Sequence, residues 1–231
     1  MRLASVDIGS NTVRLLIAEV EGQRITPIYY GHRITRLAKG LRERGTLDSG
    51  AVSETIQTLE EFQNIIRRHG VAETAVAGTE AIRSASHPET FLDTLKRRTD
   101  FEARVLQGED EARLTASAVV SSFDAKDAAF ILDIGGGSTE MMLVKEGRLV
   151  HWLSLPVGVV KLFEEHVFSD PPLPEELDSL TGAADEVAKR FAQEFAHFLD
   201  GNGVIFGTAG TPTTAAAVDL GLKQCDHERV H

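Results

Sequence analysis

Two short glycine-rich segments share a pattern that suits the binding of phosphate groups. The first reads Asp-Ile-Gly-Ser-Asn-Thr over residues 7–12, and the second reads Asp-Ile-Gly-Gly-Gly-Ser-Thr over residues 133–139. Each follows one short apolar run and precedes another, which predicts a tight turn between two antiparallel strands. Such a turn directs several N–H groups and hydroxyls at one point, and this concavity favours an anion. The predicted phosphate-binding residues of the two turns are Ser10, Asn11, Thr12, Gly136, Gly137, Ser138 and Thr139.

A third segment of similar composition, Gly207–Thr211, follows a later apolar run. It adds Thr208, Gly210 and Thr211 as predicted phosphate-binding residues. One such turn alone would be an ordinary hairpin, but the matched set favours an anion site. The segments are neither a Walker A loop, which has a lysine after its second glycine, nor a dinucleotide fingerprint, which has a helix after the turn.

Two aspartates, Asp7 and Asp133, end their strands immediately before the two turns. An aspartate that faces bound phosphate is repulsive unless a cation lies between them, so the pair predicts Mg²⁺ or Mn²⁺ as a cofactor. Glu140, just past the second turn, is a further predicted metal ligand. The alternative for each aspartate is simple turn capping.

Three consecutive acids, Glu109, Asp110 and Glu111, follow a predicted strand and open a predicted helix. Acids in a first helical turn normally interact with the helix dipole. If one of them faces a cleft, it can instead act as the general base on a water molecule.

A basic loop, residues 32–45, holds five cationic side chains against the single acid Glu43. They are Arg33, Arg36, Lys39, Arg42 and Arg44. Either the loop is simply solvated, or its charge attracts a small, highly charged anion. In the second case Arg36 is a predicted phosphate-binding residue.

The elements around the turns repeat along the chain. The first half has strands at about 3–7, 13–20 and 24–30, a helix from about 49 to 69, and a strand at 74–78. The second half has strands at about 129–133, 139–145 and 148–155, a helix from about 174 to 199, and a strand at 203–207. The first half continues with a helix opening near Pro88, a strand at about 101–107, and a helix from Glu109 to about Ser122.

This order predicts an α/β fold made of a duplicated unit with a mixed sheet in each copy. The first domain covers residues 1–122 and the second covers residues 123–231. Ligand is expected to bind in a cleft between the copies, where both turns point. Counterparts of Gly108 and Ser122 would fall at about 237 and 251, past His231, so the second domain is expected to be truncated.

Composition excludes several classes of function. The net charge of -11 argues against binding to nucleic acid or to a membrane surface, since both are polyanions. No apolar run approaches about 18 residues and no secretory signal opens the chain, so a cytoplasmic location is expected. The single cysteine, Cys225, excludes an internal disulfide, and the eight histidines show no zinc spacing.

Six motifs together resemble those of the exopolyphosphatase and guanosine pentaphosphate phosphohydrolase family, in a short form without extra C-terminal domains. The motifs are Val6–Thr12, Arg36–Leu41, Gly78–Arg83, Gly108–Leu114, Asp133–Glu140 and Gly207–Thr211. The resemblance implies a ribonuclease H-like fold of the actin, sugar kinase and Hsp70 superfamily, used twice.

The same resemblance implies roles for three residues. The family's catalytic glutamate is the second acid of the pattern glycine, any residue, acid, acid, alanine, arginine, and this falls on Glu111. Arg83 resembles a phosphate-binding arginine of the active site, and Asp133 resembles a metal-binding or catalytic carboxylate. The sequence departs from the usual pattern at Asp110, where glutamate is common.

The resemblance further implies hydrolysis of the terminal phosphate of inorganic polyphosphate, or of the 5′ γ-phosphate of guanosine pentaphosphate, by an enzyme that commonly forms a homodimer. Two alternatives stay open. One is an ATP-dependent kinase of the same superfamily, and the other is a non-catalytic sensor that binds polyphosphate or guanosine tetraphosphate.

Overall fold

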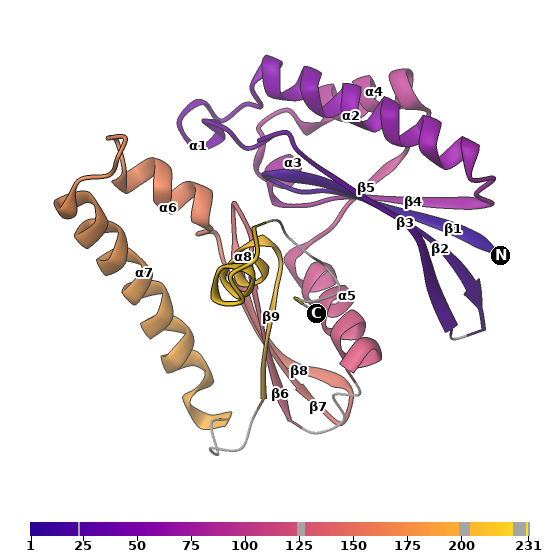
Figure 1. Ribbon diagram of the computed structural model, residues 1–231. Coiled ribbons are helices and arrows are strands. Elements are labelled where there is room, and N and C mark those ends of the chain that lie inside the picture. Colours follow the sequence, from indigo (N-terminus) through magenta and orange to yellow (C-terminus); the bar gives the residue numbers. More distant parts are fainter. Residues whose placement is uncertain (23, 124–127, 199–203, 224–229, 231) are drawn as a thin grey trace. The chain divides into compact units, whose positions relative to one another are not determined.

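The computed structural model describes residues 1–22, 24–123, 128–198, 204–223 and 230. The chain divides into two compact units, Met1–Gly108 and Glu109–His231. Each unit is built on its own sheet (Figure 1).

The first unit has a five-stranded mixed sheet in the order β3-β2-β1-β4-β5. Strand β2 runs antiparallel to β1 and β3, whereas β4 runs parallel to β1 and β5. The strands are β1 Arg2–Ile8, β2 Thr12–Glu21, β3 Arg24–Ile34, β4 Glu73–Gly78 and β5 Ala103–Val105. The helices are α1 Leu41–Arg44, α2 Ser49–Arg68, α3 Glu80–Ser84 and α4 Pro88–Thr99.

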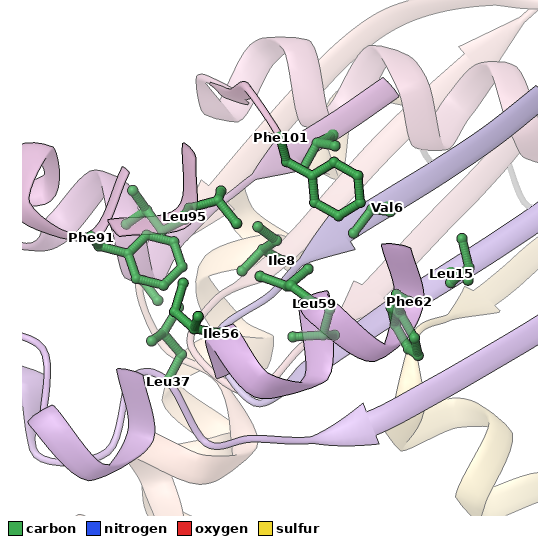
Figure 2. Close-up of a cluster of buried hydrophobic side chains, with 14 of the residues drawn as sticks. Val6, Ile8, Leu15, Leu37, Ile56, Leu59, Phe62, Phe91, Leu95 and Phe101 are labelled. Carbon is green, nitrogen blue, oxygen red and sulfur yellow. The ribbon is translucent and has the colours of Figure 1, made fainter. Parts of the chain in front are cut away.

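A single apolar core holds the strand β1 in place (Figure 2). Alternate residues of β1 and β2, among them Val6, Ile8 and Leu15, are fully buried. Helix α2 covers them with a stripe spaced three and four residues apart, as its sequence predicts, made of Ile56, Leu59, Phe62 and Ile66. Burial of each such side chain stabilises the unit by about 1.5–3 kcal/mol, which fixes the end of β1 that leads into the first turn.

Helix α2 begins where the sequence predicts. The Asp48 carboxylate accepts hydrogen bonds from the N–H groups of Gly50 and Ala51, both at 3.0 Å. These bonds satisfy two of the free donors of the first helical turn, and they lower the pKa of Asp48.

The second unit has a four-stranded mixed sheet in the order β8-β7-β6-β9. Its strands are β6 Ala129–Ile134, β7 Thr139–Lys145, β8 Arg148–Leu155 and β9 Val204–Thr208. Its helices are α5 Gly108–Phe123, α6 Val159–His166, α7 Pro174–Phe195 and α8 Gly210–Asp219, and a 3₁₀ turn, Ala196–Phe198, follows α7.

Helices α5 and α7 cover opposite faces of this sheet. Ile131 packs in one apolar cluster with Ala116 and Val119 of α5, whereas its neighbour Phe130 packs in another with Phe195 of α7. Successive strand residues point to opposite faces, so the two helices lie on the two sides of β6.

Most of the predicted elements are confirmed, with ends that differ by a few residues. The strand expected at 101–107 is only three residues long, and α3 and α6 were not predicted. The long helix α7 is buried only near its C-terminal end, at Phe191 and Phe195. Helix α5 makes its core contacts in the second unit, whereas the boundary after residue 122 stays a prediction.

Candidate functional site

The first turn, Gly9–Thr12, joins β1 to β2. It is closed by a hydrogen bond from the N–H of Gly9 to the carbonyl of Thr12, with an N···O distance of 3.1 Å. A Cβ atom on Gly9 would lie 2.9 Å from that carbonyl oxygen, so the turn requires glycine at this position.

The inner carbonyls of this turn are bound to the loop after β3. The Ser10 carbonyl accepts from the N–H of Ala38 at 2.9 Å, and the Asn11 carbonyl accepts from the N–H groups of residues 35–36 at 3.0 and 3.1 Å. In a trans peptide the N–H points opposite to the C=O. The N–H groups of Asn11 and Thr12 therefore point away from this loop, as an anion-binding turn requires.

The second turn, Gly135–Ser138, lies 126 residues later and has the same closing hydrogen bond, but the carbonyls bound by the neighbouring element are shifted by one position. The N–H of Gly135 donates to the carbonyl of Ser138 at 3.0 Å, and the carbonyls of Gly135 and Gly136 accept the first two N–H groups of α6 at 3.0 and 3.1 Å. By the same geometry, the N–H groups of Gly136 and Gly137 point away from α6.

Gly158, which sequence reasoning missed, packs directly on this second turn. A Cβ atom at position 158 would lie 2.5 Å from the carbonyl oxygen of Gly136 and 2.6 Å from that of Gly135. Only a residue without a side chain lets α6 approach closely enough to bind these carbonyls. The available signal was an isolated glycine within the apolar run Leu155–Val160, which often marks a close approach of two backbones.

Two of the predicted phosphate-binding hydroxyls donate within the protein. The Ser10 hydroxyl donates to the Glu80 carboxylate at 2.9 Å, and the Thr139 hydroxyl donates to the carbonyl of Val157 at 2.7 Å. Each hydroxyl has a single proton, and here both protons are used in hydrogen bonds that stabilise the turns.

In the second unit, a row of polar residues crosses the sheet beside the turn. Asp133 of β6 lies opposite Glu140 of β7 and beside Thr208 of β9, and Glu140 lies opposite Ser154 of β8. Glu140 is 4% exposed and accepts a hydrogen bond of 2.7 Å from the Ser154 hydroxyl. Paired positions on neighbouring strands share a face of the sheet, so the two carboxyl groups are neighbours.

The equivalent row in the first unit has a positive side chain, Arg14, at the position that Glu140 occupies in the second unit. Asp7 lies opposite Arg14, and its carboxylate forms an ion pair with the Arg14 guanidinium at 3.0 Å. Burial raises the pKa of Asp7, and the charge and hydrogen bond of Arg14 oppose that shift. The first aspartate therefore has a positive partner within the protein.

The donor set at Asp133 and Glu140 fits a hard divalent cation. Two like charges directly opposite each other are destabilising unless a positive charge compensates them, and Mg²⁺ and Mn²⁺ prefer carboxylate oxygens. Asp7 fits this role less well because Arg14 already neutralises it, and its assignment as a metal ligand stays a prediction. Among the residues that the structure describes, no three His, Cys, Asp or Glu side chains form a metal-binding group.

The three acids that open α5 differ in their surroundings. Glu109 is exposed and forms an ion pair with Arg113, four residues later, at 2.7 Å. Glu111 is half-buried and lies in the same compact unit as Asp133. Glu109 thus behaves as an ordinary surface acid, whereas the role of the half-buried Glu111 as the base stays a prediction.

Both predicted arginines lie in the first unit. Arg36 is exposed, has a φ of 50°, and binds the first turn through its N–H. Arg83 of α3 donates to the carbonyl of Leu106 at 2.6 Å, two residues before α5 begins. Arg36 therefore flanks the first turn, while Arg83 ties α3 to the segment that leads to the three acids.

The third glycine-rich segment joins β9 to α8. Thr208 ends the strand, Ala209 has a φ of 67°, and Gly210 begins the helix. The hydroxyl oxygen of Thr208 is buried and has no hydrogen-bond partner among the described residues. Thr208 lies beside Asp133 because the register of β9 on β6 differs by two residues from that of β4 on β1. Gly207 of β9 pairs with Leu132, whereas the equivalent Gly78 of β4 pairs with Ile8.

Two separate groups of predicted residues result. Asp7, Ser10, Asn11, Thr12 and Arg36 lie at the first turn, with Arg83 elsewhere in that unit. In the second unit, Asp133, Gly136, Gly137, Ser138, Thr139, Glu140 and Thr208 lie at or beside the second turn, with Gly210 and Thr211 opening α8. The ligand cleft expected between the two halves stays a prediction.

No helix in the described part of the chain has the length and apolar character needed to cross a membrane.

Comparison with known proteins places this arrangement among phosphatases. The chain is 36% identical over 174 residues to exopolyphosphatase 1 of Mycobacterium tuberculosis, covering 74% of this chain and 51% of that protein. It is 31% identical over 237 residues to a bifunctional 3-dehydroquinate synthase/phosphatase of Fusobacterium nucleatum, covering 99% of this chain and 36% of that protein. The chain thus spans about half the length, or less, of these two relatives.

The solved structures agree. The crystal structure of the Aquifex aeolicus member of the Ppx/GppA family aligns over the whole chain and 73% of its own, with 34% identity and a TM-score of 0.78. The fold is the duplicated α/β fold of the actin-like ATPases, as the resemblance implied. A model of the Ppx/GppA phosphatase family matches residues 16–230, and the chain belongs to that family.

Proposed function

We propose that this protein hydrolyses phosphoanhydride bonds and releases the terminal phosphate of inorganic polyphosphate. The observation that carries the proposal is the pair of turns with the same closing hydrogen bond, one of which lies beside two neighbouring carboxylates. Relatives named exopolyphosphatase support the same substrate class.

The turns suit a polyanion through their backbone donors. The N–H groups of Asn11 and Thr12, and those of Gly136 and Gly137, are free of the loops that bind the neighbouring carbonyls. We assign them to non-bridging phosphate oxygens, where fixed donors stabilise charge that develops during transfer. Asp133 and Glu140 would hold Mg²⁺ or Mn²⁺, which supplies positive charge to the phosphate oxygens when it is bound.

Glu111 is the proposed general base. It accepts a proton from a water molecule as the water oxygen forms a bond to the terminal phosphorus. The bond from that phosphorus to the bridging oxygen breaks at the same time, which leaves orthophosphate and a chain shorter by one phosphate. Arg83 is proposed to bind a phosphate oxygen of the same substrate.

The test is phosphate release from long-chain polyphosphate with Mg²⁺, measured for the wild-type chain and for Glu111→Gln. Loss of a general base costs about 10² to 10⁴ in rate, so that variant should fall by this factor. Glu109→Gln is the matched control because it removes the same charge from the same helical turn at an exposed position. Equal rates for wild type and Glu111→Gln would remove Glu111 as the base.

The same assay separates the narrower possibilities. Short polyphosphate and guanosine pentaphosphate serve as further substrates, and their relative rates decide whether the nucleotide is also hydrolysed. A chain that binds polyphosphate with no release would be a sensor, and ATP-dependent phosphorylation of an acceptor would make it a kinase. A homodimer and a cytoplasmic location stay predictions.

A further inference from the structure

A buried carboxylate lies directly behind the first turn. Glu80 opens α3 and is 5% exposed. One of its carboxylate oxygens accepts from the Ser10 hydroxyl at 2.9 Å, and the other accepts from the Ser84 hydroxyl at 3.0 Å. This is an unexpected neighbour for an anion-binding turn, since an ionised carboxylate repels phosphate.

The hydrogen bond fixes the direction of the Ser10 hydroxyl. A serine hydroxyl has one proton and two lone pairs, and an ionised carboxylate can only accept. The proton of Ser10 therefore points inward to Glu80, and the lone pairs are what the hydroxyl can offer to a ligand. A phosphate oxygen also needs a donor, so it gains nothing from this hydroxyl.

The pair is not needed to form the turn. The second turn has the same closing hydrogen bond, yet it has Gly136 where the first has Ser10. The segment that follows β9, Thr208–Thr211, contains no carboxylate in place of Glu80. The second unit thus forms the same closing hydrogen bond without either partner, which leaves ligand binding as a role for the pair.

We infer that Glu80 is a positioning residue that turns the Ser10 hydroxyl away from bound phosphate and so weakens the hold of the first turn on the product. This inference rests on the proposed function and deepens it. Phosphate is bound at this turn by the N–H groups of Asn11 and Thr12, and the carboxylate behind them favours release of orthophosphate after each cleavage.

The test measures the dissociation constant of orthophosphate by titration calorimetry, on the whole chain with Mg²⁺. Ser10→Ala should leave it within about twofold of wild type, because the hydroxyl gives no bond to phosphate; a donor role would cost about tenfold. Glu80→Met removes the acceptor and the charge, so it should tighten binding by about three- to tenfold. In the double variant that also carries Ser10→Ala, the gain in orthophosphate affinity from Glu80→Met should shrink to the part due to the lost charge alone.

Ser84→Ala is the control, since it keeps the Glu80 charge and the Ser10 bond, and its dissociation constant should match wild type. Thermal denaturation of each variant checks folding. If Glu80→Met does not fold, the dissociation constants of Ser10→Ala and Glu80→Gln test the inference instead. Glu80→Gln is expected to tighten orthophosphate binding through loss of charge.

Three results in the variants would overturn the inference: a loss of affinity of about tenfold or more in Ser10→Ala, no gain of affinity in Glu80→Met, or a gain in Glu80→Met that is undiminished without the Ser10 hydroxyl. Absence of orthophosphate binding to the wild-type chain would overturn it as well. Binding is measured without turnover, so a chain that binds orthophosphate and hydrolyses no polyphosphate would end the proposed function and leave only the effect of Glu80 on phosphate binding, with no role in product release.

Discussion

At the scale of single residues, the two strand-ending aspartates differ most in what lies opposite them. Asp7 lies across from Arg14, and Asp133 lies across from Glu140 at the same position of the repeat. One pair sums to no charge and the other sums to two negative charges when both groups are ionised. The second pair therefore gains more from an added cation.

The substitution Glu140→Gln tests this difference. Without metal, the variant should be more stable than wild type because a like-charge contact is gone. With Mg²⁺ the order should reverse, since a ligand at about one hundred times its dissociation constant stabilises wild type by about 2.7 kcal/mol. Thermal denaturation with and without Mg²⁺ measures both effects, and Glu164→Gln, at an exposed position on α6, is the control. Equal stabilisation of Glu140→Gln and wild type by Mg²⁺ would contradict the assignment.

Asp7 makes stability depend on pH in a definite direction. Burial raises its pKa above the ordinary value of 3.8, so the folded state holds this proton more tightly than the unfolded chain does. The free energy of unfolding therefore loses a contribution as pH rises from 3.8 through the raised pKa. Asp7→Asn removes that loss. The melting temperature of the variant minus that of wild type should increase across this range and then stay level.

Thermal melts at a series of pH values measure this difference, with Asp178→Asn, exposed on α7, as the matched control. A difference that falls as pH rises would show that the Arg14 charge, and not burial, dominates at Asp7.

At the scale of elements, the second turn depends on a helix that the sequence pattern does not reveal. Helix α6 has only eight residues, so its apolar residues Val159, Val160, Leu162 and Phe163 form too short a pattern to distinguish a helix from a strand, unlike the long stripe of α2. Its first N–H groups bind the turn, and this contact needs the absence of a side chain at Gly158. Such backbone contacts leave only an isolated glycine in the sequence.

Gly158→Ala should damage the second turn. Its Cβ would overlap the carbonyls of Gly135 and Gly136, and overpacking of this kind costs about 1–3 kcal/mol. Phosphate release should fall along with the melting temperature. Gly182→Ala in α7 is the matched control: nothing lies within 4 Å of its added Cβ, and alanine in a helix gains about 0.5–1 kcal/mol. An unchanged rate in Gly158→Ala would show that α6 does not support the turn.

At the scale of the whole molecule, the duplication, the order of elements along the chain and the two turns were predictable because they repeat in the sequence. Strand pairing was not, because it depends on register. The row that brings Thr208 beside Asp133 needs the two-residue shift of β9 relative to β4, and nothing in the hydrophobic pattern indicates that register. The inward direction of the Ser10 hydroxyl was hidden for a similar reason, since Glu80 lies 70 residues away along the chain.

The division of the chain into units leads to a prediction about fragments. Ala112, Ala116 and Val119 of α5 are buried against the second sheet, and each large side chain left uncovered costs about 1.5–3 kcal/mol. A fragment of residues 109–231 should therefore melt at a higher temperature than one of residues 123–231. Circular dichroism on heating measures both, with residues 1–108 and 1–122 as the complementary pair. Equal stability of the two C-terminal fragments would favour the boundary after residue 122.

The contrast between Arg14 and Glu140 also concerns the source of the positive charge that neutralises each strand-ending aspartate. An arginine is covalently attached, so the first unit always has its counter-charge in equal amount, whatever the surroundings contain. If Asp133 and Glu140 bind a divalent cation as proposed, that counter-charge comes from solution, where the amount varies. The proposed site would then make only the second unit respond to the free concentration of divalent ions.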